Sequence, residues 1–172
     1  MGKVDQLVTN FAVYEDAIDY LGIAEVEFPE ISSLVEEIKG AGIAGAVEAV
    51  VIGHLEAMTV TFSFNTVTDA SIKLSEPRVH NIDCRVAQQN QNTRTGQIAQ
   101  DSVKHIMRTI PKKFAPGKAA VASPAEASGE HACQYYAMWK NGVKVTELDP
   151  LNFICMVNGV DYLKEVRKAL GK

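Results

Sequence analysis

The run with the strongest chemical signature is Gly-Ala-Gly-Ile-Ala-Gly-Ala-Val at 40–47. Its spacing satisfies both G-x-G-x-x-G, the fingerprint of dinucleotide-binding loops, and G-x-G-x-x-G-x-V, the kinase glycine loop. A dinucleotide site needs a helix directly after the loop, because the amides of its N-terminus receive the pyrophosphate. Residues 46–53 are instead Val-rich and end in glycine, which favours a strand. A kinase would also need catalytic and metal-binding loop motifs, and the sequence contains neither. We interpret the run as a hairpin tip, and nucleotide binding stays the less favoured alternative.

Histidines and cysteines are the other residue types that could ligate a metal or attack a substrate. They are His54, His80, His105, His131, Cys84, Cys133 and Cys155. Their spacing matches no zinc motif. His131 and Cys133 could support nucleophilic chemistry only beside an orienting carboxylate, which the sequence does not indicate. Three widely spaced cysteines fit a reduced compartment and small hydrophobic roles. We therefore expect no catalytic residue, no metal and no cofactor, and hence no enzyme.

Two further groups have a binding and a structural interpretation. Lys112, Lys113 and Lys118 surround Phe114 in a proline-containing stretch, which indicates a solvated loop or a contact with an acidic partner surface. The aromatic group Tyr135, Tyr136 and Trp139 is more typical of sheet packing than of a ligand cage.

Composition sets outer limits on the function. The chain has 172 residues, 17 basic against 21 acidic, and a formal net charge of −4, which argues against a protein that grips nucleic acid. We expect one domain over 1–172, no stable membrane association and no secretion signal in MGKVDQLVTNF.

The elements that position these residues are mostly predicted strands. Residues 57–65 alternate most regularly, with Met58, Val60, Phe62 and Phe64 on an apolar face. The opposite face is small, polar and uncharged: Thr59, Thr61, Ser63 and Asn65. Such a strand is buried on one side and wet on the other.

Other segments are predicted from alternation and from turn residues. We expect an irregular arm at 1–10, two short strands within 11–29, and strands at 34–39, 47–52, 78–88 and 97–110. Loops are expected at 88–96 and 111–130, and Thr68 should cap a helix over 69–75.

The C-terminal block, 134–172, carries the strongest turn signal. Asn141-Gly142 joins two strands as a hairpin, because both central residues must take positive φ. A third strand begins at Phe153 and ends at Asn158-Gly159. Asp161 is expected to cap a helix over 162–170, whose basic residues lie near its C-terminus. The predicted fold is mainly β: an antiparallel β-sandwich or barrel with a short central helix, a C-terminal helix and a long glycine-rich hairpin.

This block also resembles the C-terminus of the phage major tail tube proteins, which form the inner tube of contractile phage tails and of R-type tail-like bacteriocins. The matching residues are Glu147, Asp149, Leu151, Asn152, Val157, Asn158, Gly159, Val160, Asp161, Leu163, Glu165, Arg167, Ala169, Leu170 and Gly171. Tyr20, Gly22, Ala24, Val26 and Pro29 match the opening of the family, while 66–130 matches only in outline.

The family's long hairpin is also present, and the resemblance implies that it contacts neighbouring subunits. The corresponding positions are Glu36, Glu37, Ile38, Lys39, Gly40, Gly42, Ile43, Gly45 and Val47, with Ile38 in place of an aromatic residue and Lys39 in place of the family's basic residue.

The resemblance further implies hexameric rings stacked into a hollow tube that a contractile sheath drives through the target cell envelope. The implied partners are the sheath protein, a baseplate initiator, a tail terminator, and a tape-measure protein or DNA passing through the lumen. Such a protein is assembled in the bacterial cytoplasm and resides in a virion or tail-like particle. The face of Thr59, Thr61, Ser63 and Asn65 is our candidate for the lumen wall. An exported tube protein of a type VI secretion-like system is the alternative. The resemblance does not distinguish a phage tail from a bacteriocin.

Overall fold

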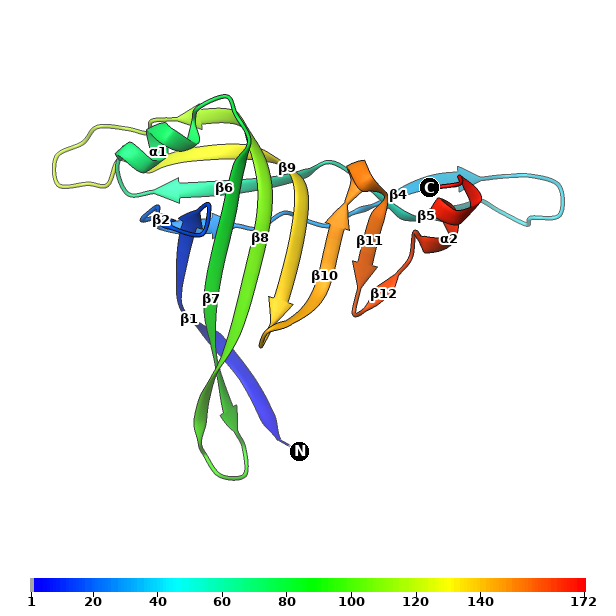
Figure 1. Ribbon diagram of the computed structural model, residues 1–172, viewed down its shortest axis with the longest axis horizontal. Coiled ribbons are helices and arrows are strands. Elements are labelled where there is room, and N and C mark those ends of the chain that lie inside the picture. The colour runs from blue at the N-terminus through cyan, green and yellow to red at the C-terminus, as the bar shows by residue number, and fades with distance from the viewer. Residues whose placement is uncertain (1) are drawn as a thin grey trace.

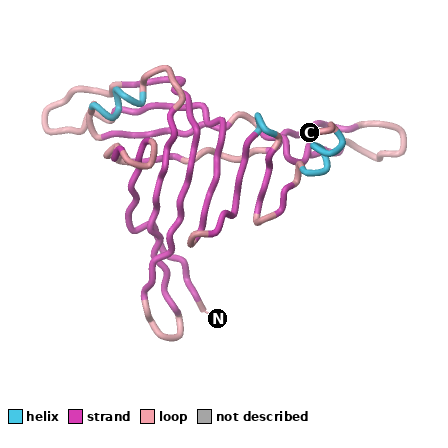
Figure 2. Tube along the Cα trace, in the orientation of Figure 1, coloured by secondary structure: helices cyan, strands magenta, loops and turns pink. Residues whose placement is uncertain are grey.

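Strands dominate the structure, a computed structural model that describes residues 2–172. The strands are β1 (Lys3–Glu15), β2 (Asp19–Tyr20), β3 (Glu25–Glu27), β4 (Ser33–Ile38), β5 (Val47–Leu55), β6 (Met58–Phe64), β7 (His80–Asn92), β8 (Ile98–Ala115), β9 (Ala127–Lys140), β10 (Val143–Asp149), β11 (Ile154–Val157) and β12 (Val160–Asp161). The helices are α1 (Asp69–Leu74), the 3-10 turn η1 (Pro150–Asn152) and α2 (Lys164–Ala169), all peripheral to the sheet (Figure 2). The predicted mainly β, antiparallel class is confirmed, with 57% of the residues in strands.

One antiparallel sheet of ten strands folds over on itself to make two layers (Figure 1). Its main path runs β12-β11-β10-β9-β8-β7-β1-β2, and β6 pairs with β9 and β3. One edge of β9 serves two partners, since β6 pairs with its first half and β10 with its second. Two register shifts bend these strands where they change layer, as bulges do in curved sheets: Gln134 is the extra residue in β9, and Lys112 is the extra residue in β8. We call β1, β7, β10 and the adjoining halves of β8 and β9 the tall layer. The crossing layer is β3, β6 and the other halves of β8 and β9.

The hydrophobic core lies between these layers, and β6 supplies the side chains of one wall. The burial of β6 alternates as predicted, with Met58, Val60, Phe62 and Phe64 buried. The tall layer supplies the opposite wall, including Ile82, Cys84, Met107 and Leu148. Each large apolar side chain buried here contributes about 1.5–3 kcal/mol to folding. The register of β6 is thereby determined, because a slip of one residue would bury its threonines instead.

The glycine-rich hairpin β4-β5 is a separate two-stranded sheet that projects from one end of the molecule (Figure 1). Its base is held by the Glu56 N–H, which donates to the Ser32 carbonyl at 2.8 Å. Gly53 of β5 lies so close to Leu163 that a Cβ at this position would be 2.5 Å from Leu163 Cδ2. Every residue of β4 is exposed. A two-stranded hairpin is only marginally stable alone in water, so this element lacks most of the packing that strands ordinarily have.

The predictions for 1–10 and 88–96 were wrong over the described residues, and Met1 lies outside them. Residues 3–10 form the first part of β1, and β7 continues to Asn92, so only 93–97 connect β7 to β8. With β8 these strands make an arm that extends beyond the core (Figure 1). Amide side chains link its strands, with Gln6 Nε2 donating to Gln91 Oε1 at 2.9 Å and Gln89 Nε2 to Gln6 Oε1 at 2.7 Å. The arm has no apolar face toward a core, which is why its pattern did not indicate strands.

The predicted loop 111–130 was too long at both ends. β8 continues to Ala115 and β9 begins at Ala127, which leaves 116–126 as the connection. Pro111 is tolerated because it lies at a register shift, where a missing N–H costs little.

The turn predictions at the C-terminus are confirmed. Asn141 and Gly142 have φ of 49° and 81° and close the β9-β10 hairpin, and Asn158 and Gly159 repeat this geometry between β11 and β12. The short strand β12 was not predicted. Phe153 has a left-handed φ of 54° and precedes β11, so the third strand begins one residue later than expected.

The two helix predictions differ in outcome. Thr68 caps α1 in a capping box with Ser71, as expected. The C-terminal helix α2 begins at Lys164, and its N-cap Leu163 has no side-chain hydrogen bond, so Asp161 is not its cap. The Asp161 carboxylate instead accepts from the Leu163 N–H at 3.0 Å and binds Arg167. Across residues 2–172, no helix is both long and apolar enough to cross a membrane.

Candidate functional site

The glycine run 40–45 forms the tip of the β4-β5 hairpin, and a strand follows it. This geometry provides no helix N-terminus for a pyrophosphate, so the dinucleotide interpretation loses its structural basis. Gly42 has φ of 91°, whereas Gly40 and Gly45 do not have positive φ. Only Gly42 therefore requires glycine for its backbone conformation.

The hairpin exposes apolar side chains on both of its faces. Leu34, Val35, Ile38, Ile43, Val47, Val50, Val51 and Ile52 are all at least 40% exposed. Acidic residues accompany them, and Glu37 lies directly opposite Glu48 in the register of the two strands. Lys39 contacts Glu37 at 2.8 Å and is the one basic side chain of the run 33–52. A small sheet with apolar and acidic faces of this kind is typical of an interaction surface.

The polar face of β6 lies on the outside of the crossing layer. Thr59, Thr61 and Ser63 are partly exposed, and Asn65 lies just beyond the strand. Acidic residues of the neighbouring strands share this face. Glu25 and Glu27 of β3 pair with Ser63 and Thr61, and Glu130 of β9 pairs with Thr61 from the other side. Lys112 Nζ donates to Thr59 Oγ1 at 2.9 Å, at the β8 edge.

Four cations lie over aromatic rings on the outer face of the tall layer. The pairs are Arg85 with Tyr14, Lys104 with Trp139, Lys144 with Trp139 and Arg108 with Tyr135, at 4.7, 5.8, 5.2 and 5.2 Å from the ring centroids. The sheet-packing interpretation of the aromatic group is consistent with this, and Tyr136 lies in the core. A bulge between Lys144 and Thr146 places Lys144 on the same face as Glu147, at 3.0 Å, although simple alternation would separate them.

Three of the four histidines are buried within the fold. His105 stacks on Phe28 with 3.9 Å between ring centroids, and its Nδ1 is 2.9 Å from the Tyr136 hydroxyl. His131 Nδ1 lies 3.2 Å from Thr109 Oγ1. Burial lowers the pKa of each to about 4, so both are neutral at pH 7. The fourth histidine, His54, is exposed on the hairpin. The structural interpretation of these residues agrees with their surroundings.

Glu15 is a buried carboxylate that the sequence analysis did not single out. Its oxygens lie 2.7 Å from His80 Nδ1, 3.0 Å from Lys73 Nζ and 2.8 Å from an Arg78 guanidinium nitrogen. Burial raises the pKa of Glu15, but hydrogen bonds from these partners outweigh it and hold the pKa below its usual value. The cluster ties the end of β1 to α1 and to the start of β7. The Glu15 side chain has no exposed surface. Its contacts therefore stabilise the fold, and a substrate could not reach it.

The cysteines do not form a reactive site. All three are unpaired and buried, and burial raises the pKa of Cys84 to about 12 and that of Cys133 to about 11. The thiolate is the reactive form of cysteine, so these thiols are inert at neutral pH. No cluster of three or more potential ligands for a metal occurs in the part of the chain that the structure describes.

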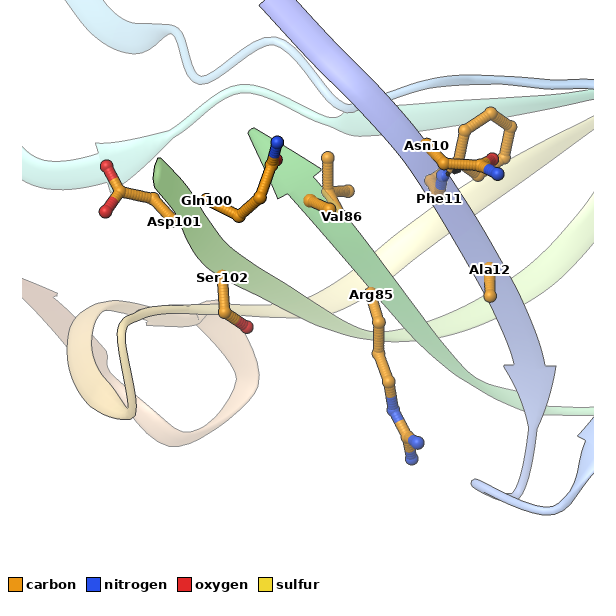
Figure 3. Close-up of a pocket in the computed structure, with 9 residues that line it drawn as sticks. Asn10, Phe11, Ala12, Arg85, Val86, Gln100, Asp101 and Ser102 are labelled. Atoms are coloured by element: carbon orange, nitrogen blue, oxygen red, sulfur yellow. Dashed lines mark hydrogen bonds between the residues drawn. The ribbon is translucent and has the colours of Figure 1, made fainter. Parts of the chain in front are cut away.

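A hollow of about 400 Å³ opens where the arm joins the tall layer (Figure 3). Phe11, Ala12, Val86 and Ala87 give it an apolar lining, and Val86 and Arg85 extend to opposite sides of β7 (Figure 3). Its polar members already have partners, since Arg85 binds Asp83 and Asp101 binds Lys3. The lining holds no pair of nucleophile and base.

Comparison with known proteins gives a consistent result. A family model described as phage tail tube protein FII matches residues 5–171. The tail tube protein of Escherichia phage P2 is 26% identical over 162 residues, which cover 92% of this chain and 93% of that protein. Among solved structures, the sheath/tube terminator of an extracellular contractile injection system (PVC) has a TM-score of 0.54 at 12% identity. That match covers 79% of this chain and 97% of the other, and it shows a shared fold.

Proposed function

Because the chain belongs to the phage tail tube protein FII family, a family of structural tail tube proteins, we propose that it forms hexameric rings that stack into a hollow tube. The tube is the inner conduit of a contractile phage tail or tail-like particle, and the sheath drives it through a target envelope. The family match over 5–171 carries this proposal.

The shape of the subunit supports head-to-tail association. The hairpin projects from one end of the long axis, and the connection 116–126 projects from the other (Figure 1). A contact that joins unlike ends of identical subunits repeats by rotation, and it closes into a ring when the rotation per subunit divides a full turn, as it does at 60° for a hexamer. The two faces of such a ring differ from each other, so rings can stack face to back indefinitely in one direction. The exposed apolar side chains of the hairpin supply the driving force for these contacts.

Two surfaces receive roles in this proposal. The hairpin positions Glu36, Glu37, Ile38, Lys39, Gly40, Gly42, Ile43, Gly45 and Val47 contact a neighbouring subunit. The outer face of the crossing layer, with Thr59, Thr61, Ser63 and Asn65, lines the lumen. The acidic residues beside this face give it a mildly negative potential, which suits a channel because a cargo such as DNA must pass without being held.

The partners follow from the same proposal. A contractile sheath protein surrounds the tube, a baseplate protein nucleates it and a terminator ends it, while a tape-measure protein or DNA occupies the lumen for a time. The fold shared with a sheath/tube terminator is consistent with a tube whose end is closed by a related protein. Subunits assemble in the bacterial cytoplasm and remain in the particle.

Electron microscopy of the purified protein tests the proposal. We expect rings or tubes at high concentration, formed faster in the presence of the baseplate protein from the same operon. A monodisperse monomer at millimolar concentration that also fails to join tubes in its native operon would contradict it. Free protein in the culture supernatant, without particles, would indicate the exported type VI-like alternative.

A further inference from the structure

Four residues form one straight row across the outer face of the tall layer. Arg85 of β7 pairs directly with Lys104 of β8, Lys104 with Trp139 of β9, and Trp139 with Lys144 of β10. We call these four residues the cationic row. Three gaps between neighbouring strands give it a length of about 14 Å. The charged side chains of Arg85, Lys104 and Lys144 are 50%, 40% and 35% exposed, so a partner can reach them.

The row carries three positive charges against two nearby carboxylates, because Glu147 pairs with Lys144 at 3.0 Å and Asp83 is shared by Arg85 and Lys104. Arg85 and Lys104 are directly opposite each other, and like charges in that arrangement destabilise a sheet. One carboxylate, that of Asp83, serves both, at 2.9 Å from Arg85 and 3.7 Å from Lys104. Arg108, four residues further along β8 on the same face, has no ion pair among residues 2–172. The free subunit therefore holds a repulsive pair of cations that an anionic partner would relieve.

The hairpin has the complementary arrangement. Glu37 and Glu48 are directly opposite across β4 and β5, with Lys39 beside only one of them. On the same face, Val35 pairs with Val50, and both are at least half exposed. Ser33 to Ile38 extends about 17 Å along the strand, similar to the length of the row. The hairpin face and the cationic row are therefore opposite in charge and similar in length.

Apolar complementarity extends the match. The hollow of Figure 3 lies at the Arg85 end of the row, and its apolar lining on the face of Arg85 is given by Ala12 and Ala87. A valine or isoleucine from a partner can fill it, while Trp139 offers an apolar surface at the centre of the row. A contact of this composition, with an apolar part and charges at its border, is typical of protein interfaces.

We propose that the Glu37/Glu48 face of one subunit's hairpin docks on the cationic row of a second copy. This inference rests on the proposed function, because it specifies which surfaces the ring or the stack joins. The two like-charge pairs, each unfavourable in the free subunit, then neutralise each other across the interface. The complementary charges select the correct partner surface more than they add affinity. The docked hairpin also covers the outer face of the tall layer and leaves the face of β6 open to the lumen.

A charge-swap experiment tests this inference. Glu48→Lys and Lys104→Glu are each expected to raise the concentration at which tubes form by at least about tenfold, because each places like charges together across the interface. The double variant Glu48→Lys/Lys104→Glu restores opposite charges between the two altered residues, and it is expected to assemble within about threefold of the wild type. Sedimentation and electron microscopy measure assembly, and thermal unfolding of each free subunit confirms folding. Lys164→Glu, an exposed site on α2, is the matched control and should assemble normally.

The results distinguish a failure of the proposed docking from a failure of the proposed function. If Lys104→Glu destabilises the fold beside Asp83, Lys104→Gln is used, with a smaller expected loss of assembly. Wild-type tubes combined with a double variant no better than the single variants would overturn the docking. A defect for Lys104→Glu without one for Glu48→Lys would also overturn it, since another partner would then cover the row. If the wild type forms no tubes under any condition, the proposed function itself fails.

Discussion

At the scale of single residues, the structure separates polar groups that hold the fold from those that can meet a partner. Glu15, His80, His105 and His131 are buried and contact neighbouring polar side chains, whereas the cationic row and the hairpin carboxylates remain accessible. Burial of a charge is costly unless partners compensate it, so the buried groups are expected to report on stability. The exposed groups are expected to report on assembly.

Replacing Glu15 by glutamine should lower the free energy of unfolding by about 3 kcal/mol, because it removes the carboxylate that compensates Lys73, Arg78 and His80. Asp19→Asn is the matched control. It removes the other carboxylate on Lys73, but Asp19 is 58% exposed, and the expected loss is below about 1 kcal/mol. Urea denaturation measures both. Equal losses would show that burial does not distinguish the two sites.

Acid should destabilise the fold between pH about 6.5 and about 4. His105 and His131 have folded-state pKa values of about 4, lowered from 6.5 by burial, so the unfolded chain takes up their protons first as pH falls. As the pH falls through this range, each histidine lowers the free energy of unfolding by up to about 1.4 kcal/mol per pH unit. His131→Gln should lower this slope by up to about 1.4 kcal/mol per pH unit, because one buried histidine fewer takes up a proton on unfolding. A slope unaffected by His131→Gln would contradict the assignment.

At the scale of elements, the hairpin is the part most dependent on assembly. It is a two-stranded sheet with exposed faces, and its contact with the rest of the chain is concentrated at its base, where Gly53 meets Leu163. Changes at its tip should therefore alter subunit contacts without altering the core.

Gly42→Val should weaken tube formation about tenfold and leave the stability of the free subunit within about 0.5 kcal/mol. Gly42 has φ of 91°, which a β-branched residue adopts only with strain, and the tip around it is open. Gly96→Val is the control, because its φ of 71° imposes the same kind of strain in equally open surroundings, but it lies between β7 and β8, outside the hairpin, and should assemble normally. Hydrogen exchange at 40–46 should be faster in the free subunit than in the tube. Parallel loss of folding and assembly would mean that the core needs Gly42.

At the scale of the whole molecule, the two outer sheet faces differ in character. The face of β6 is small, polar and acidic at its border, whereas the tall layer carries cations and aromatic rings. A tube needs one face toward its lumen and one toward its surroundings, and this difference assigns the β6 face to the lumen in our proposal.

Thr61→Cys in tubes capped at both ends should react with small maleimides and resist bulky ones, because a lumen site is reached only through the ends. The native cysteines give little background, since all three are buried. The unassembled variant is the control and should react with both reagents. Rapid labelling of capped tubes by bulky reagents would place this strand on the outer wall.

Local sequence patterns were sufficient to predict the elements whose pattern and packing agree. The alternation of 58–64, the Asn141-Gly142 turn and the Thr68 cap were all predicted, because each depends on neighbouring residues or on one buried face. The family resemblance could likewise be recognised from the residues of the C-terminal block. The glycine run was predicted as a hairpin tip, since a strand pattern followed it.

The remaining features could not be predicted from local patterns, because they arise from contacts between segments distant in the chain. Gln- and Asn-rich segments became strands of the arm through pairing with one another and not through an apolar face. A bulge after Lys144 moved it to the face of Glu147, which no alternating pattern could indicate. Glu15 meets residues 58 to 65 positions away, and the cationic row draws on three strands beyond β7. Burial and charge at these sites follow from the register between strands, which a local sequence pattern does not contain.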